Sequence, residues 1–402
     1  MQTWKKNLYI MFVAQFFSAI AFAVMFPFLP RYVNSLDSIL GLNKTFLIGA
    51  VYSAQAITTT VFSPLWGALA DRFGKKLMVL RSMFAATVVM ILIAFASSAE
   101  VLLILRAIQG MITGVAAASN AFVASAVPKE RTGYAMGLMS VAVLLGVSVG
   151  PLVGGVVADS YGYRAAFFIT ASLLLIGGLL VLIGVKVEEY DKSEKAKKLK
   201  IIKDWKTLFS AQGVSLLYFL RFMSWLGRSA IVPYLPLFLA TIVLDEKRLN
   251  TATGLLLAVS AATATLTSIY FGRLGDRIGH KKVLVFSSLM VALAFLPQFW
   301  LKSYWWLLLF QALAGVFLGG VLPTISALLN NLIKHGEEGS AYGFDSSIIA
   351  LARALAPMLG AVIVLWGGFR MIFVFTAALF AISSILAFWK LPNPQNLNKD
   401  PL

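Results

Sequence analysis

Twelve long apolar stretches constrain the fold of this chain more than any other feature of its sequence. Each is bounded by charged or turn-forming residues, and each reaches the roughly 20 apolar residues that a helix needs to cross the hydrocarbon core of a bilayer. The pattern therefore predicts an all-α membrane protein with twelve transmembrane helices. The expected spans cover residues 7–33, 44–70, 77–97, 101–124, 133–158, 163–186, 212–240, 250–271, 282–301, 304–332, 340–365 and 369–390.

The charge distribution also indicates a chain that lies in a membrane. Only 13% of the 402 residues are charged, about half the share that is typical of a soluble protein. The net charge is +17, and most Lys and Arg residues fall in the loops of one side, as in the cytoplasmic loops of a cell inner (plasma) membrane protein. An even number of spans then predicts that both termini are cytoplasmic. The same distribution argues against nucleic acid as a partner.

An internal repeat runs along nearly the whole chain. The segment GALADRFGKK at 67–76 recurs as GRLGDRIGHKK at 272–282, and other matching positions keep a separation of 205 or 206 residues. They include Pro27 with Pro233, Pro30 with Pro236, Arg106 with Gln311, Pro151 with Pro357, and Arg164 with Arg370. Two such repeats predict two pseudo-symmetric six-helix bundles with a site between them near the middle of the bilayer. We expect a first bundle at 1–187, a linker at 188–210, a second bundle at 211–390 and a tail at 391–402.

Several segments resemble signature motifs of the major facilitator superfamily. They are 67–76 with its second copy at 272–282, RAIQG at 106–110, and GVSVGPLVGG at 146–155, which is similar to a motif of antiporters. The segments PFLPRYV at 27–33 and ADSYGYR at 158–164 resemble the bacterial twelve-span drug:proton antiporters of the MdtG multidrug-exporter type. The resemblance covers essentially the whole chain. It implies the major facilitator fold and a secondary transporter that works by alternating access.

The resemblance also implies that two of these motifs control conformational change. Asp71 is expected to act as a cytoplasmic latch against the N-terminus of span 11, where the helix dipole favours a carboxylate. The basic residues of the loop are equally well explained as charges that set topology, and the glycines of span 5 as positions of close packing. The candidate latch and gating residues are Gly67, Asp71, Arg72, Gly74, Lys75, Gly146, Gly150, Pro151, Gly154, Gly272, Asp276 and Arg277.

One carboxylate, Asp345, is expected to lie embedded in a span, about one turn into the eleventh. Ionisable residues within a membrane are costly and are therefore functional candidates. Asp345 is our candidate proton carrier; the alternative is a carboxylate that the dipole at the start of the helix stabilises. Many proton-coupled drug exporters carry a carboxylate in span 1 or 4, whereas span 1 here has none.

Embedded basic residues outnumber embedded carboxylates in the predicted spans. Arg221, Trp225 and Arg228 share one face of span 7, because they are spaced four and three residues apart. This excess of positive charge suggests amphipathic substrates that include anions; the alternative is that these Arg side chains bind backbone carbonyls. Arg81, near one end of span 3, is expected to extend toward the interface. The candidate substrate and proton pathway comprises Gln15, Tyr52, Gln55, Arg106, Asn120, Arg221, Trp225, Arg228, Asp345 and Arg353.

These features favour a proton-coupled multidrug exporter that takes small molecules and protons as its partners in the lipid bilayer. Two alternatives stay open: a transporter of one physiological solute, such as an organic anion, a sugar or a siderophore, and a carrier of lipids or amphiphiles. A phosphate-binding glycine loop is absent from the sequence, which argues against ATP as the energy source. We expect no enzymatic activity, no metal and no cofactor, with the proton gradient as the driving force. A monomer is expected because one chain holds both repeats.

Overall fold

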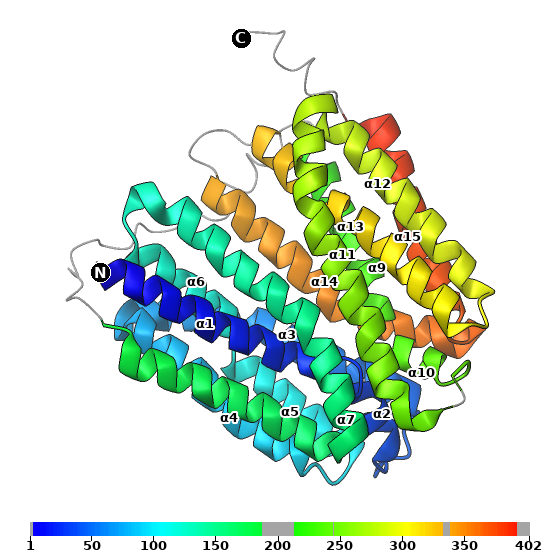
Figure 1. Ribbon diagram of the computed structural model, residues 1–402, viewed down its shortest axis with the longest axis horizontal. Coiled ribbons are helices and arrows are strands. Elements are labelled where there is room, and N and C mark those ends of the chain that lie inside the picture. Colours follow the sequence, from blue (N-terminus) through cyan, green and yellow to red (C-terminus); the bar gives the residue numbers. More distant parts are fainter. Residues whose placement is uncertain (1–2, 187–212, 244, 333–337, 392–402) are drawn as a thin grey trace. The chain divides into compact units, whose positions relative to one another are not determined.

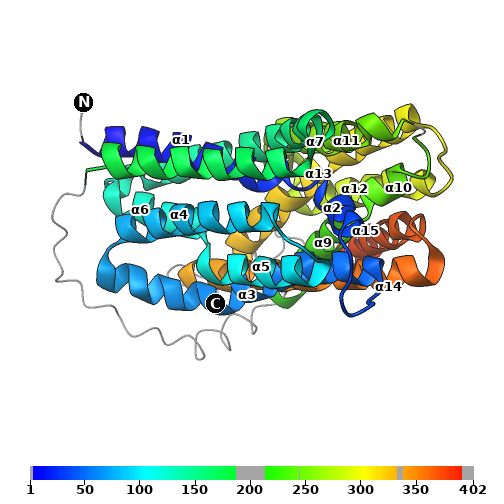
Figure 2. The same ribbon diagram turned by 90° about the horizontal axis from the view of Figure 1, so that it is seen from below.

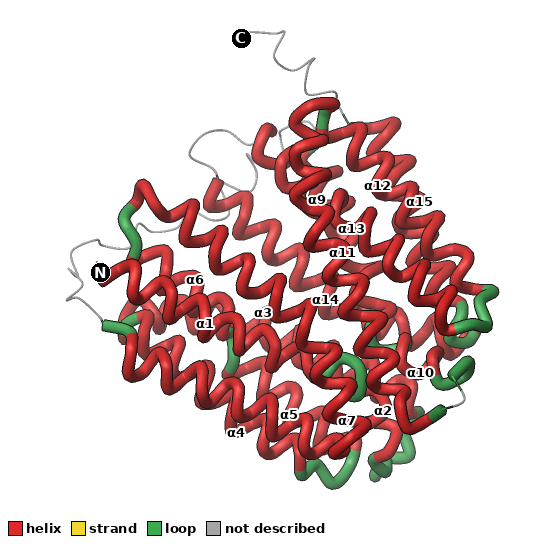
Figure 3. The backbone as a smooth tube through the Cα atoms, viewed as in Figure 1, coloured by secondary structure: helices red, strands yellow, loops and turns green. Residues whose placement is uncertain are grey.

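A computed structural model describes residues 3–186, 213–243, 245–332 and 338–391, and these residues form helices joined by short loops (Figures 1 and 3). No strand occurs within these four ranges, in agreement with the predicted all-α class. The helices of the first half are α1 (Thr3–Val24), α2 (Leu29–Ser35), α3 (Lys44–Phe73), α4 (Lys75–Ala94), α5 (Ala99–Ile112), α6 (Val115–Ala126) and α7 (Thr132–Gly184). Those of the second half are α9 (Val214–Ile231), α10 (Leu235–Leu239), α11 (Leu249–Ile278), α12 (His280–Phe295), α13 (Tyr304–Leu332), α14 (Glu338–Gly367) and α15 (Met371–Lys390).

Ten helical stretches of the described residues are long and apolar enough to cross a membrane. One of them is α7, whose 53 residues contain a non-helical Gly162 that separates two of the predicted spans. The helix α9 corresponds to predicted span 7, and its two arginines lower its hydropathy. Dividing α7 at Gly162 and adding α9 gives the twelve predicted spans, so the predicted fold class is confirmed.

Three predicted spans are interrupted where the sequence analysis expected continuous helices. Predicted span 1 breaks between α1 and α2, and predicted span 7 breaks between α9 and α10, in both cases beside the repeated prolines. Proline lacks an N–H group and disfavours a helical conformation in the residue before it, so each break follows from the local sequence. Predicted span 4 breaks between α5 and α6 at Gly114. The φ of this residue is 131°, a conformation that glycine adopts readily because it has no Cβ atom.

The backbone repeats its turns as well as its sequence. Gly74 and Gly279 immediately precede α4 and α12 and have φ values of 95° and 97°. Gly162 and Gly368 have φ values of 83° and 77° at the turns that follow predicted spans 5 and 11. Side chains with a Cβ rarely adopt such angles. Glycines with similar positive φ values therefore form the turns at equivalent positions of both halves of the chain.

The chain clusters into two compact units. One comprises Met1–Tyr190 with Val232–Ala261, and the other comprises Asp191–Ile231 with Ala262–Leu402. The first unit thus includes α10 and the beginning of α11 from the second sequence repeat. The predicted linker at 188–210 lies outside the described residues, and the predicted boundaries of the two bundles stay a prediction.

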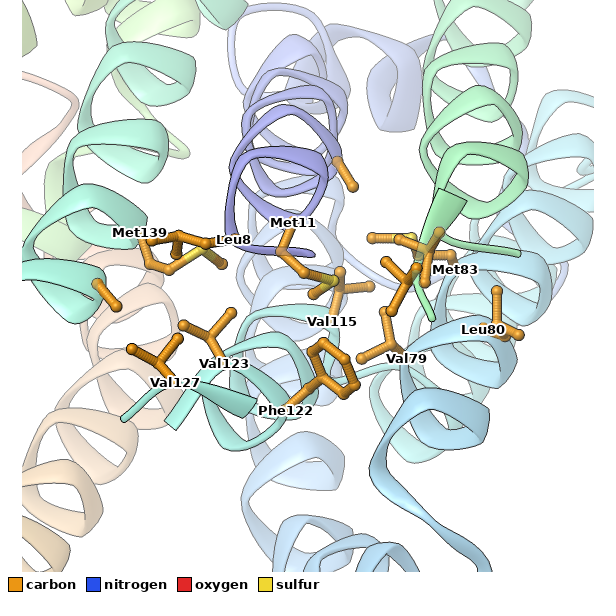
Figure 4. Close-up of a cluster of buried hydrophobic side chains, with 14 residues drawn as sticks. Leu8, Met11, Val79, Leu80, Met83, Val115, Phe122, Val123, Val127 and Met139 are labelled. Atoms are coloured by element: carbon orange, nitrogen blue, oxygen red, sulfur yellow. The ribbon is translucent and has the colours of Figure 1, made fainter. Parts of the chain in front are cut away.

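Helices α1 and α7 run alongside each other in the first unit (Figures 1 and 2). Near their first turns they share an apolar core with α4 and α6 (Figure 4). Met11 and Met83 are both fully buried in this core, where flexible thioether side chains fill irregular gaps. The residues labelled in the figure are Leu8, Met11, Val79, Leu80, Met83, Val115, Phe122, Val123, Val127 and Met139.

Candidate functional site

The first unit holds a buried cationic cluster around Arg106 of α5, which is 1% exposed. Its Nη1 donates a hydrogen bond of 2.6 Å to Oε1 of Gln109, and its Nη2 donates one of 2.9 Å to Oε1 of Gln55 on α3. The ring of Tyr52 lies 5.9 Å from the guanidinium carbon. Two amides and an aromatic ring therefore stabilise this charge, and none of the three partners carries a negative charge.

Other polar groups are buried in the same unit without a hydrogen-bond partner. They belong to four helices of the unit: Gln15 Oε1, Ser53 Oγ, Gln109 Nε2 and Ser119 Oγ. A buried polar group without a partner costs about 1–3 kcal/mol. Asn120 of α6 is half-buried. Of the pathway residues predicted in this half, the structure brings together Tyr52, Gln55 and Arg106.

The second unit holds a buried ion pair between α9 and α14. Nε of Arg221 lies 2.9 Å from Oδ1 of Asp345, and the two side chains are 4% and 10% exposed. The guanidinium also donates to the carbonyl oxygen of Leu322 at 3.1 Å and to Oγ of Ser326 at 2.6 Å. All three nitrogen atoms of the guanidinium are thus hydrogen-bonded, as a charge removed from water requires.

Asp345 therefore lies inside the protein, as the sequence analysis expected, although more deeply than one turn into α14. It stands seven residues after Glu338, the first residue of α14. Tyr218, on α9, packs beside the pair: its ring meets Phe344 edge to face at 4.8 Å, and its hydroxyl donates to the carbonyl oxygen of Ala341. The pair is therefore held between two helices by aromatic and backbone contacts.

Trp225 and Arg228 continue along the α9 face that carries Arg221. The guanidinium carbon of Arg228 lies 5.6 Å from the centre of the Trp225 ring, within cation–π range. The indole Nε1 of Trp225 is buried without a hydrogen-bond partner. Arg353, two turns after Asp345 on α14, has an exposed side chain. Among these residues of the second unit, Arg221 is the one paired with a carboxylate, so its charge is neutralised.

The loop motif and its second copy make a contact that the sequence analysis did not foresee. Nζ of Lys76 donates to the carbonyl oxygens of Leu182 and Val185, at 3.0 and 2.7 Å, where α7 ends. Lys281 donates in the same way to the carbonyl oxygen of Leu391, just after α15, at 2.6 Å. A cation that binds the last carbonyls of a helix stabilises its C-terminus. Lys76 and Lys281, which are separated by the repeat distance of 205 residues, therefore have the same structural role, and repetition of the motif was its signal.

The latch residues of the loops are only partly described. The side chain of Asp71 lies outside the described side chains, so its contact with span 11 stays a prediction. Asp276, its counterpart, is exposed and lies 3.3 Å from Nε2 of His280. Arg72 is exposed beside the ring of Phe73.

The predicted gating glycines of α7 pack against α1. A Cβ atom at Gly146, Gly150 or Gly154 would overlap with backbone atoms of α1. Gly155 instead faces the first turn of α11, where the carbonyl oxygen of Asn250 occupies the space of a Cβ. The motif thus provides close packing on two sides of one helix.

A hydrogen-bonded clasp joins α7 to the start of α11 in the first unit. The Oδ1 atom of Asp159 accepts from Nδ2 of Asn250 at 2.7 Å, and its Oδ2 accepts from the N and Oγ1 of Thr251, both at 2.6 Å. A carboxylate at a helix N-terminus is favoured by the free N–H groups and by the dipole. The sequence analysis missed this role. Its signal was the spacing of Asp159 and Gly162, which repeats that of Asp71 and Gly74.

Arg81 makes a contact that the sequence analysis did not foresee, and its extension toward the interface stays a prediction. Its guanidinium carbon lies 3.3 Å from the centre of the Trp66 ring on α3, and its Nε and Nη1 atoms are buried without a hydrogen-bond partner. The indole of Trp66 is itself held by a hydrogen bond to the carbonyl oxygen of Met111. The aromatic ring stabilises the half-buried cation at this position.

Relatives of the chain match it over almost its full length. "Multidrug resistance protein MdtG" of Serratia proteamaculans is 32% identical over 400 residues, which cover 99% of this chain and 97% of the relative. The protein of the same name from Proteus mirabilis is 32% identical over 393 residues, 98% of each chain. The one from Salmonella typhimurium is 32% identical over 382 residues, 95% of this chain and 94% of the relative.

Solved structures share the fold at low sequence identity. A D-xylose–proton symporter aligns with a TM-score of 0.81 at 14% identity, covering 98% of this chain and 99% of the symporter. A bacterial homologue of the human lysosomal transporter Spinster aligns with a TM-score of 0.80 at 13% identity, covering 96% and 97%. The family model described as Major Facilitator Superfamily matches residues 11–245 and again 217–402. The chain therefore belongs to the major facilitator superfamily of membrane transporters.

Proposed function

We propose that this secondary transporter exports chemically diverse small molecules in exchange for protons. The observation that carries the proposal is the 32% identity over 99% of the chain to a protein named for multidrug resistance. The buried ion pair between Arg221 and Asp345 in the second half supports the coupling to protons. Aromatic rings and guanidinium groups offer amphipathic molecules both an apolar face and a charge, and Trp225 with Arg228 is such a pair.

In this proposal Asp345 carries the proton. When it is ionised, it neutralises Arg221 and holds α14 against α9. A proton on the carboxylate removes that attraction, while Arg221 keeps its hydrogen bonds to Leu322 and Ser326. Protonation then changes the strength of one contact between two helices, and such a contact can bias an equilibrium between two conformations.

A transporter of one physiological solute is the second candidate. The buried polar atoms of Gln15, Gln109 and Ser119 that lack partners are hydrogen-bonding groups that a hydrophilic solute could satisfy. A site built in this way rejects analogues that lack the matching groups. It predicts saturable, stereospecific transport of one compound class.

The test uses purified protein in proteoliposomes with an imposed pH gradient and a pH-sensitive dye in the lumen. Several unrelated drugs should each trigger proton movement, and a protonophore should abolish drug transport. A change in lumenal pH that only one solute triggers, and only one of its stereoisomers, would favour a transporter of one physiological solute. A lumenal pH that responds to none of the compounds, while one of them still binds, would contradict proton-coupled drug export.

Replacing Arg228 with Gln should weaken the transport of anionic substrates and leave that of cationic ones unchanged. Loss of one charged hydrogen-bonding partner costs about 1.5–3 kcal/mol, so the KM for anions should rise by about 10- to 100-fold. Transport assays with matched anionic and cationic drugs measure the effect. Arg273→Gln, which removes an exposed cation of the same half, is the control. An unchanged KM for anions in the Arg228 variant would contradict the proposal that Arg228 binds anionic substrates.

We also propose that both termini are cytoplasmic and that the protein works as a monomer. The sequence contains no cysteine, so a single introduced cysteine reports on one position. A cysteine replacing Ile39, which is 73% exposed, should react in intact cells with a thiol reagent that cannot cross membranes. A cysteine replacing Lys282 should react only after the cells are permeabilised. The reverse pattern of labelling would invert the topology.

A further inference from the structure

An open cavity of about 650 Å³ lies at the first turns of α1 and α7. It has no part in the proposed transport pathway. Its walls come from three parts of the first unit: α1, the segment that precedes α7, and α7 itself. The lining residues are Trp4, Lys5, Leu8, Tyr9, Pro128, Glu130, Arg131 and Tyr134.

The rim of the cavity carries more positive than negative charge. Lys5 and Arg131 are exposed, and Glu130 is the one acidic lining residue. Within the described part of the chain, neither cation forms an ion pair with Glu130. Lys5 lies over the ring of Trp4, with its Nζ 5.5 Å from the ring centre. Two cations therefore remain available to an anion.

The floor and sides of the cavity are apolar or aromatic. Leu8 is 2% exposed and belongs to the core cluster of Figure 4, and Trp4 packs against that cluster. Tyr9 of α1 and Tyr134 of α7 both line the cavity and are about half exposed. Aromatic residues with a polar tip gather where a membrane meets water.

We infer that this cavity binds the phosphate headgroup of an anionic phospholipid from the cytoplasmic leaflet. The predicted topology places these ends of α1 and α7 on the cytoplasmic side, where anionic lipids attract basic residues at about 1 kcal/mol each. Lys5 and Arg131 recognise the phosphate, and the wall of Trp4, Leu8 and the two tyrosines accommodates the start of an acyl chain. A bound lipid would join the ends of α1 and α7 on the outer side of the apolar core that they share.

Native mass spectrometry of the full chain in detergent provides the test. The probes are a short-chain phosphatidylglycerol, the matching phosphatidylcholine, and glycerol 3-phosphate as a free phosphate. Phosphatidylglycerol should bind most tightly, and the double variant Lys5→Gln with Arg131→Gln should weaken its binding about 10- to 30-fold. Glu130→Gln should instead strengthen it, because the opposing charge is removed.

The matched control removes two exposed cations elsewhere on the predicted cytoplasmic side, Arg273 and Lys282, by the same Gln substitutions. It should bind phosphatidylglycerol like the unmodified protein. Equal loss in the two double variants would mean that general charge attraction explains the binding, and would overturn the proposal. Equally tight binding of phosphatidylcholine would exclude recognition of an anion, and equally tight binding of glycerol 3-phosphate would identify a site for free phosphate instead of a lipid.

Discussion

Replacing Asp345 with Ala is expected to destabilise the protein by about 3–5 kcal/mol and to abolish proton-coupled transport. The stability loss follows because Arg221 would keep a full charge in a buried position without its partner. The loss of coupling follows if Asp345 carries the proton. Thermal unfolding in detergent measures the first effect, and drug transport in proteoliposomes with a pH gradient measures the second.

A double variant separates these two effects. Arg221→Met together with Asp345→Leu replaces the ion pair by apolar side chains of similar volume, an exchange that often leaves stability unchanged or improves it. We expect the double variant to unfold near the temperature of the original protein and yet to show no transport driven by a pH gradient. If this variant, or Asp345→Asn, kept full pH-driven transport, another group would have to carry the proton.

Replacing Asp159 with Ala is expected to release the start of α11 from α7. The carboxylate accepts four hydrogen bonds from Asn250 and Thr251, and hydrogen bonds to a charged group contribute about 1.5–3 kcal/mol each. Loss of even one such bond would change a two-state equilibrium about tenfold or more. α11 begins in the first unit and continues in the second, so freeing its first turns should alter the conformational equilibrium of the transporter.

The measurement again uses the absence of natural cysteines. A cysteine replacing Met25, which is 2% exposed between α1 and α2, should react slowly with an impermeant thiol reagent in the otherwise unmodified protein. In the Asp159→Ala background, labelling should be about ten times faster, in proportion to the shifted equilibrium. Asp245→Ala removes a carboxylate from the turn before α11 that, among the described residues, accepts a hydrogen bond from the N–H of Lys247, and it should leave the rate unchanged. An unaltered labelling rate after loss of Asp159 would mean that its hydrogen bonds only stabilise the start of α11 and do not affect the conformational equilibrium.

The fold could be predicted from the sequence because the evidence for a transmembrane helix is local. About 20 apolar residues in succession are sufficient for each span, and the repeat fixed how the spans are grouped. The interruptions at Pro27 and Pro233 could also have been predicted from the same local chemistry. They were missed because the prolines were used as markers of the repeat and their effect on the helix was not considered.

The site could be predicted only in part, because its contacts join residues far apart in the chain. Arg221 and Asp345 were both expected inside the membrane, but 124 positions separate them, and their pairing depends on how α9 packs against α14. The contact of Lys76 with the end of α7 required the same knowledge of packing. Because Asp345 neutralises Arg221, the embedded positive charge of the second unit that has no carboxylate partner among the described residues rests with Arg228 and Arg353.

The depth of the ion pair has a consequence for energetics. Arg221 and Asp345 each stand seven residues after the first residue of their helix, which is about 10 Å along the helix axis. With those ends in the cytoplasm, the pair lies about one third of the way across a hydrocarbon core of about 30 Å. A proton from outside would then cross about two thirds of the membrane voltage before it reached Asp345, a contribution of about 1.5 kcal/mol per 100 mV. If Asp345 carries one proton inward in exchange for a neutral substrate, each cycle moves one net positive charge, and the electrical potential would drive the exchange as well as the acidity.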